Sequence, residues 1–193
     1  MKRIINIKTK EEVKFTKENL PLFVHGKEHS GASLLSITIA SLLHSSRVKL
    51  CIFTAYPMAK EEFMKQVENP VNVYYLEDKK NISEALRFQT IIVQSGNIDL
   101  FIKIILNTVG MKDRIIFIKN IETIHVQILE LVKSYTFMVS GDLDFNLLQN
   151  EFKNMTYNTK IFTSPMEGVI IPPLEKYQAF MKDNIGDRII AVN

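Results

Sequence analysis

The stretch Phe23-Val-His-Gly-Lys-Glu-His-Ser-Gly-Ala-Ser33 decides the fold of this chain of 193 residues. Its first three residues end a short apolar run, 20–25. Its last residue begins a segment, 33–44, that is apolar on nearly every side. A strand, the pattern Gly-x-x-x-x-Gly-x-Ser and a helix therefore follow one another, which is the layout of a phosphate-binding loop. The glycines allow the backbone to fold around an anion, and the first turn of the helix offers N–H groups that have no partner within the helix.

Short apolar runs alternate with helix-length segments along the rest of the chain. The runs are rich in β-branched and aromatic residues and mostly lack a period-two pattern, which is typical of parallel strands buried on both faces. They lie at 20–25, 48–54, 71–76, 90–93, 114–118, 135–139 and 159–163. The segments between them predict helices at 33–44, 59–67, 100–109, 121–133 and 142–152. This alternation predicts a three-layer α/β sandwich around a central, mainly parallel sheet.

The composition indicates an ordered protein. Hydrophobic residues make up 46% and charged residues 23% of the chain, values that exclude a disordered polypeptide. The single cysteine, Cys51, lies in an apolar run, so a buried thiol is expected and an intramolecular disulfide or cysteine-rich zinc site is excluded. No apolar segment reaches the roughly 18–20 residues that span a bilayer, and the N-terminus lacks a signal-peptide core. We therefore expect a cytoplasmic protein without membrane insertion.

A chain of this length predicts one domain, in which three parts can be distinguished. Residues 1–19 form an N-terminal extension with an extra strand at 4–7, residues 20–165 form the core, and residues 166–193 form a C-terminal tail. The net charge of +3 equals the excess in the extension, which has six basic and three acidic residues, so the rest of the chain is close to neutral. A near-neutral core favours a protein partner or a second copy of the chain over a polyanion. Nucleic-acid binding by the extension stays open as an alternative.

The tail contains the pair Pro172-Pro173, which ends the regular pattern of the core. After this pair, the sequence predicts a helix at 174–181 and a final edge strand at 187–192. The apolar residues near the two prolines leave two interpretations open, because they either pack on the core of this chain or present a docking surface.

The loop and the segments around it resemble the P-loop NTPase superfamily, on the side of its RecA-, KaiC- and AAA-like branch. The resemblance extends over residues 20–165 and rests on the layout together with a few residues. It implies that ATP or ADP is bound with Mg²⁺ by four residues of the loop. These residues are Gly26, Lys27, Gly31 and Ser33.

The loop departs from the family pattern at its most important position. The family has a lysine before the final serine, which contacts the β- and γ-phosphates, and this chain has Ala32 there. Lys27 stands where the ParA/MinD-like branch has a second lysine, so it is the candidate substitute. The glycine pair of that branch is replaced by Glu28 and His29, whose side chains are bulkier and include a carboxylate that repels phosphate.

The strand that holds Mg²⁺ in this family ends in an aspartate, and two strands of this chain compete for that place. Under the first alignment the strand ends at Gln94 and Ser95, and the next strand ends near Asn120, which resembles the polar sensor position of the family. Under the second alignment the strand before Asn120 is the magnesium strand, with Lys119 in the position of the aspartate and Glu122 as the acid. Neither alignment places an aspartate at the strand end.

Joint loss of the loop lysine and the magnesium-binding aspartate predicts a domain that kept the fold without the chemistry. We therefore expect no catalytic residues and no metal site, and a scaffold or regulatory role through protein–protein contacts in a DNA-processing or motor assembly. The four histidines have no metal-ligand spacing, which agrees with this expectation. The alternative is an ATP-binding protein with weak or partner-dependent ATPase activity, in which Lys27 or a neighbouring subunit supplies the missing lysine. The missing groups favour a protein that is not an enzyme.

Overall fold

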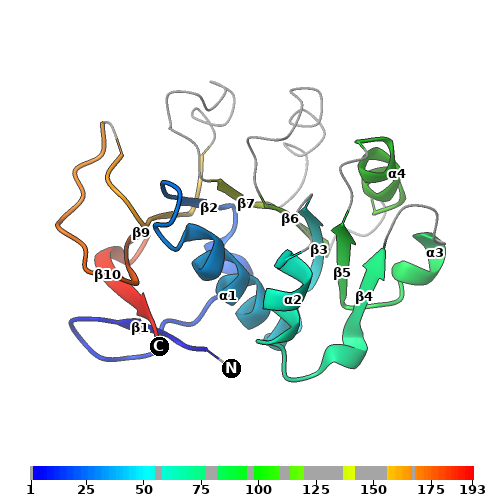
Figure 1. Ribbon diagram of the computed structural model, residues 1–193, viewed down its shortest axis with the longest axis horizontal. Coiled ribbons are helices and arrows are strands. Elements are labelled where there is room, and N and C mark those ends of the chain that lie inside the picture. Colours follow the sequence, from blue (N-terminus) through cyan, green and yellow to red (C-terminus); the bar gives the residue numbers. More distant parts are fainter. Residues whose placement is uncertain are drawn as a thin grey trace.

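The computed structural model describes residues 2–54, 58–76, 82–94, 98–108, 114–119, 137–141, 156–166 and 168–193. These residues form the strands and helices drawn in Figure 1. The strands are β1 (Ile4–Asn6), β2 (Leu22–His25), β3 (Lys49–Thr54), β4 (Val73–Leu76), β5 (Thr90–Gln94), β6 (Arg114–Lys119), β7 (Phe137–Gly141), β8 (Thr159–Phe162), β9 (Gln178–Asp183) and β10 (Gly186–Val192). The helices are α1 (Ala32–Ser45), α2 (Met58–Met64), α3 (Ile82–Ala85) and α4 (Ile98–Thr108), with short 3-10 helices at Lys17–Asn19 and Pro70–Asn72.

The described strands belong to one sheet, in the order β1-β10-β9-β8-β2-β7-β6-β3-β5-β4. The strands from β8 to β4 in this order are parallel. The hairpin β9–β10 and strand β1 add an antiparallel end, in which β9 pairs with β8. This sheet confirms the predicted mainly parallel architecture. It also brings the carboxyl ends of β8, β2, β7 and β6 side by side at one edge, where ligands bind in folds of this kind.

Helices cover both faces of the sheet, which makes the fold a three-layer sandwich (Figure 1). One core, which we call the α1-side core, contains residues of α1, Phe63 of α2 and alternate strand residues such as Leu50 and Phe117. The opposite core contains residues of α3 and α4 with the strand residues in between, such as Cys51 and Ile118. Because the central strands bury apolar side chains on both faces, they lack a period-two pattern in the sequence.

Helix α1, predicted at 33–44, is buried along most of its length although it contains several hydroxyl residues. The buried hydroxyls are satisfied within the helix, because Ser36 Oγ donates to the Ala32 carbonyl at 2.7 Å, Thr38 Oγ1 to the Leu34 carbonyl at 2.8 Å and Ser41 Oγ to the Thr38 carbonyl at 2.8 Å. Small side chains therefore allow the helix to pack closely on β2, β3, β6 and β7 without leaving these hydroxyls unpaired.

The tail differs from the prediction. The helix predicted at 174–181 is wrong, because the chain turns at Tyr177, which has a φ of 68°, and continues as strand β9. Ala179 enters the α1-side core and Phe180 enters the opposite core, so this segment has the period of a strand with two buried faces. The strand predicted at 187–192 is present as β10, but β1 lies outside it in the sheet, so β10 is not the edge.

The remaining expectations concern the N-terminal strand, the residues near the two prolines, the division of the chain and two predicted helices. The extra strand expected at 4–7 is present as β1. Of the apolar residues near the two prolines, Ile171 and Leu174 lie against the opposite core, whereas Ile170 is 92% exposed. Strands β1, β9 and β10 join the same sheet as the core strands, and the division into extension, core and tail stays a prediction. The helices predicted at 121–133 and 142–152 lie outside the described residues.

The expected buried thiol is confirmed. Cys51 is a free cysteine within β3, and burial raises its pKa to about 12. A thiol with such a pKa stays protonated near neutral pH, so it is not a nucleophile in the folded protein. Among the helices that the structure describes, none is long and apolar enough to cross a lipid bilayer.

Candidate functional site

The loop between β2 and α1 follows a path that favours glycine at two positions. A Cβ atom on Gly26 would lie 1.9 Å from Thr163 Oγ1 and 2.2 Å from Ser30 Oγ. Gly31 has a φ of 88°, in the left-handed region, and is the N-cap of α1. A separate steric requirement therefore favours glycine at each of the two glycine positions of the predicted phosphate-binding pattern.

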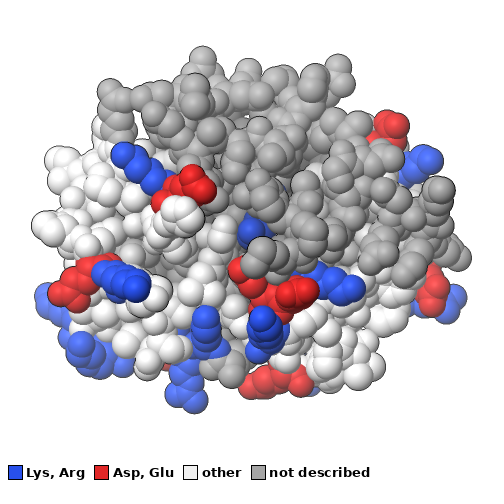
Figure 2. Space-filling model, in the orientation of Figure 1, with Lys and Arg blue, Asp and Glu red and all other residues white. Residues whose placement is uncertain are grey.

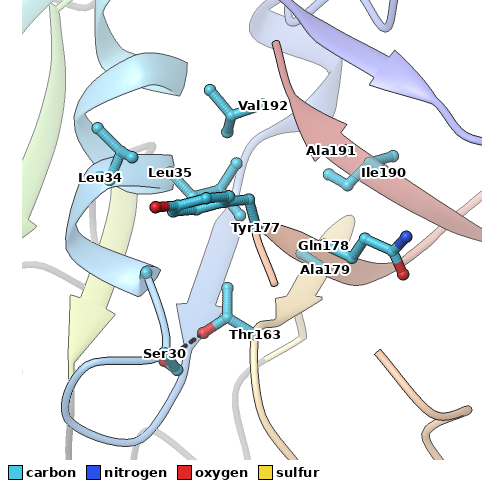
Figure 3. A pocket seen from close by; sticks show the side chains of 11 residues that line it. Ser30, Leu34, Leu35, Thr163, Tyr177, Gln178, Ala179, Ile190, Ala191 and Val192 are labelled. Atoms are coloured by element: carbon cyan, nitrogen blue, oxygen red, sulfur yellow. Dashed lines mark hydrogen bonds between the residues drawn. The ribbon is translucent and has the colours of Figure 1, made fainter. Parts of the chain in front are cut away.

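Two hydroxyl residues that follow β8 hold the loop in place. Thr163 Oγ1 and Ser30 Oγ are 2.6 Å apart and share a hydrogen bond, which Figure 3 shows. The backbone N–H of Lys27 donates to Ser164 Oγ at 2.8 Å. The backbone N–H of Thr163 donates to the carbonyl of His25 at 2.9 Å. The end of β8 thus fixes both the start and the middle of the loop.

The bulky residues of the loop point into solvent. The side chains of Glu28 and His29 are 83% and 90% exposed, and 3.5 Å separates Glu28 Oε1 from His29 Nε2. The side chain of Lys27 is exposed as well. Neither Glu28 nor His29 therefore fills the space within the loop, so the steric obstacle that their size suggested is absent.

The first turn of α1 is open to an anion. Gly31 has no side chain that accepts a hydrogen bond from the helix, and the first turn contains no acidic residue. The N–H groups of Ala32 and Ser33 lie in this turn, where a helix supplies no carbonyl partner. The positive end of the helix dipole adds to these donors. Such a turn after a glycine-containing loop suits phosphate oxygens.

A cavity of about 470 Å³ lies beside the loop. Its walls come from the loop, from the end of β8 and from the tail, and they include Ser30, Thr163, Pro172 and Tyr177. Tyr177 is 58% exposed, and Figure 3 shows its ring beside α1 in a smaller neighbouring pocket that Leu34 also lines. The volume lies within the range of about 300–1,000 Å³ that is usual for small-molecule sites. A polar loop next to an apolar wall suits a ligand with an anionic end and a flat apolar end.

Strand β6 lies closer to the loop than β5 does. The sheet order puts only β7 between β2 and β6, but β7, β6 and β3 between β2 and β5. With about 4.8 Å between neighbouring strands, β6 is about 10 Å from β2 and β5 is about 19 Å away. The end of β5 at Gln94 is therefore not brought together with the loop. The strand order favours the second alignment, in which the strand ends at Lys119.

Lys119 lies on the face of the sheet that α1 covers. Side chains alternate along a strand, and Phe117 belongs to the α1-side core while Ile118 belongs to the opposite core. Lys119 is paired with Ser140 of β7, which is paired in turn with Val24 of β2. The two residues Lys119 and Ser140 are only 7% and 4% exposed. A buried lysine thus lies level with the end of the strand that leads into the loop.

The described residues at this edge do not suit the Mg²⁺ that the fold implies. Mg²⁺ is held by carboxylates together with water and phosphate oxygens. The described α1-side residues near the ends of β3, β6 and β7 are Thr54, Lys119 and Ser140, which are two hydroxyls and one ammonium group. In the part of the chain that the structure describes, no group of three His, Cys, Asp or Glu residues could hold a metal ion. The described donor set therefore lacks the carboxylate that a magnesium site needs, and Glu122, the acid of the second alignment, lies outside the described residues.

The sequence-predicted site residues divide into two groups. Those in the loop lie together between β2 and the first turn of α1; they are Gly26, Lys27, Gly31 and Ser33. Gln94 does not join them, because it ends the distant strand β5, and Ser95, Asn120 and Glu122 lie outside the described residues.

Sequence reasoning missed Thr163, Ser164 and Tyr177. A signal for the first two exists, since Thr163 ends and Ser164 follows the strand predicted at 159–163, and the carboxyl ends of parallel strands meet at the edge where the loop lies. Tyr177 lies in the segment that was expected to be a helix, so its place at the cavity depends on the turn before β9.

The charges of the N-terminal extension are mixed in sign. Figure 2 shows mostly basic side chains, with an acidic group beside them, along the lower left margin of the molecule, where β1 lies in Figure 1. Glu11, Glu12 and Lys14 line the same surface hollow of about 300 Å³. The two carboxylates of this hollow offset its basic groups, Lys14 and Arg188, so the hollow itself adds no support to the DNA-binding alternative.

Comparison with known proteins identifies solved structures with a similar fold. No protein-family model matches the sequence, and no curated protein matches it significantly. The genome packaging NTPase B204 from Sulfolobus turreted icosahedral virus 2, in complex with AMP, is similar in structure, with a TM-score of 0.60 at 13% identity over 89% of this chain and 96% of that chain. EccC of Thermomonospora curvata (ATPases 2 and 3), in complex with a signal sequence peptide, has a TM-score of 0.62 at 12% identity over 99% of this chain and 40% of that chain.

A third similar structure is the flagellar accessory protein FlaH from Methanocaldococcus jannaschii, with a TM-score of 0.52 at 11% identity over 89% of this chain and 88% of that chain. At such low identity the likeness concerns the fold. The parallel sheet, the loop before α1 and these structural neighbours agree with one another. The chain has the fold of the P-loop NTPases.

Proposed function

We propose that this protein binds a nucleoside di- or triphosphate at the loop 26–33 without hydrolysing it. In this proposal the phosphates lie at the first turn of α1 and the base lies in the cavity beside Tyr177. The protein then acts as a regulatory or scaffold subunit, through contacts with a partner protein or with a second copy of itself.

The observation that supports this proposal is an open loop without the groups that hydrolysis needs. The loop keeps both glycines, an uncapped helix start and an adjoining cavity of about 470 Å³. At the same time, Ala32 stands in place of the phosphate lysine, and Lys119 stands where the second alignment requires an aspartate. Binding needs the first set of features, whereas hydrolysis needs the missing groups as well.

The structural neighbours support the ligand class and the kind of partner. B204 was solved with ATPγS, sulfate, AMP and AMPPCP, and EccC was solved with a signal sequence peptide. These ligands belong to those proteins. They make a nucleotide the first ligand to test for this chain, and a protein or peptide the first class of partner.

Calorimetric titration with ATP and with ADP tests the binding part of the proposal. We expect one site with a Kd below about 100 μM, which corresponds to a binding free energy of about −5.5 kcal/mol. Ala32→Lys restores the phosphate lysine and is expected to tighten ATP binding about tenfold, because a charge-assisted hydrogen bond is added. Ser46→Lys is the matched control, since it adds the same charge at the exposed far end of α1 and leaves the affinity unchanged.

Two results contradict the proposal in different ways. Absence of saturable heat with either nucleotide at millimolar concentration removes nucleotide binding and leaves the pure scaffold interpretation. Steady phosphate release by the unmodified protein, in the presence of ATP, removes the non-hydrolysing part.

The alternative function is partner-dependent ATP hydrolysis. The exposed side chain of Lys27 favours it, because a solvent-exposed lysine in the loop can reach the nucleotide of its own chain or of a neighbouring subunit. This alternative predicts that the ATPase rate per molecule rises with protein concentration and disappears in Lys27→Ala. A rate indistinguishable from the buffer blank at every concentration excludes it for the isolated protein.

A further inference from the structure

Under the second alignment, Lys119 stands at the position where the resemblance implies a metal-binding aspartate. The residue ends β6, two strands from β2, on the face that α1 covers. It is 7% exposed, and its pairing with Ser140 holds it level with the end of β2. The strand pairing therefore fixes the position of Lys119 relative to β2.

An ammonium group and a carboxylate have opposite effects on a neighbouring cation. A carboxylate at this position draws Mg²⁺ to the phosphates, whereas an ammonium group repels a divalent cation and attracts the phosphates themselves. The neighbouring described side chains, Thr54 and Ser140, are neutral hydroxyls, which can bond to phosphate oxygens but do not compensate the charge of a metal ion.

We propose that Lys119 supplies the positive charge that Mg²⁺ supplies elsewhere in this fold, so that the site binds a nucleoside di- or triphosphate free of divalent metal. The inference rests on the proposed function, because it requires nucleotide phosphates in the loop. Lys119 already interacts with other groups of the chain, and its ammonium group carries three N–H donors, so in this proposal the phosphate oxygens share the ammonium group with those partners. The first turn of α1 supplies further N–H groups from the other side.

The first experiment compares ADP binding by the unmodified protein in EDTA and in excess Mg²⁺, both by calorimetry. We expect ADP to bind at least as tightly in EDTA as in Mg²⁺, since Mg²⁺ competes with Lys119 for the phosphates. Binding that appears only when Mg²⁺ is added overturns the inference. This comparison needs no variant, so it stays decisive even if a substitution of Lys119 impairs folding.

Variants of Lys119 test whether this residue is responsible for ADP binding in the absence of Mg²⁺. Lys119→Met is expected to weaken ADP binding in EDTA at least tenfold, because one charge-assisted hydrogen bond is lost, and Lys119→Arg is expected to keep the affinity within about threefold. Lys119→Asp is expected to bind ADP only with Mg²⁺. Lys49→Met is the matched control, because it removes an exposed lysine at the start of β3, on the opposite edge of the sheet, and is expected to change nothing.

The outcomes separate this inference from the proposed function. Absence of ADP binding in both EDTA and Mg²⁺ removes the proposed function and the inference with it. Binding that requires Mg²⁺ removes the inference alone. An equal loss of affinity in Lys119→Met and Lys49→Met also removes it, because the effect is then one of overall charge. Thermal melts followed by circular dichroism verify that each variant is folded.

Discussion

Replacing Gly26 by alanine tests whether the loop is held by the hydroxyls that follow β8. The added methyl group would lie 1.9 Å from Thr163 Oγ1, 2.2 Å from Ser30 Oγ and 3.1 Å from the Cβ of Ala32. Ordinary contacts between heavy atoms lie near 3.5–4.0 Å, so both oxygens have to move by more than about 1 Å. The hydrogen bond of 2.6 Å between them is expected to break in the process.

The magnitude follows from these two effects. Either hydroxyl can rotate about χ1, which relieves part of the overlap, so the overpacking cost lies toward the lower end of about 1–3 kcal/mol. Loss of the hydrogen bond adds about 1 kcal/mol. We therefore expect Gly26→Ala to lower the free energy of unfolding by about 2–3 kcal/mol in total.

Urea denaturation followed by circular dichroism measures this cost. Gly168→Ala is the control, because a Cβ there meets nothing within 4 Å, although Gly168, unlike Gly26, has a positive φ, of 75°. Only backbone strain of about 1 kcal/mol is expected in the control. The double variant Gly26→Ala with Thr163→Ala is expected to show coupling, since the second change removes the nearer oxygen. A Gly26→Ala protein as stable as the unmodified one refutes this account of the loop.

Three further predictions concern the core. Arg114 donates hydrogen bonds to four backbone carbonyls, so Arg114→Met is expected to lower the free energy of unfolding by about 3 kcal/mol. Arg87 is exposed, so Arg87→Met is expected to change it by almost nothing. Urea denaturation compares the two variants. Burial lowers the pKa of His44, so the unfolded chain takes up a proton at a higher pH than the folded one. The free energy of unfolding is therefore expected to fall as the pH drops below about 6.5, and to fall less in His44→Gln; an equal fall in both contradicts the assignment. Burial raises the pKa of Cys51 to about 12, so a thiol reagent is expected to label it only in denaturing urea, and rapid labelling of the native protein contradicts this.

The parallel core could be predicted from the sequence because its signals are local. Each central strand buries both faces, so a short apolar run bounded by turn residues is sufficient to identify it. The loop was identified for the same reason, since Gly26 and Gly31 have steric requirements that the spacing of the two glycines reflects.

The strand order could not be predicted, because it depends on pairings between distant segments. The residues around Gln94 and Lys119 do not indicate the strand order, in which β6 is two strands from β2 and β5 is four strands away. The choice between the two alignments of the magnesium strand therefore required the sheet. The same reason applies to Thr163, whose contact with Ser30 joins residues that are 133 positions apart.

The segment around Tyr177 was mistaken for a helix because its apolar residues are compatible with both periods over a few positions. The left-handed turn at Tyr177 and the pairing of β9 with β8 decide in favour of a strand. Both are tertiary features, and local propensity is a weak guide where an apolar run is short.

A ³¹P NMR spectrum of ATP, mixed with an equimolar amount of the protein in EDTA and followed for several hours, tests the central claim most directly. We predict that the resonances of the ATP phosphates shift or broaden when the protein is added, and that no inorganic phosphate appears. The N–H groups at the first turn of α1 explain the first result, and the absence of the loop lysine at Ala32 explains the second. Unchanged ATP resonances contradict nucleotide binding, and a growing phosphate signal that addition of Mg²⁺ accelerates contradicts a non-hydrolysing site.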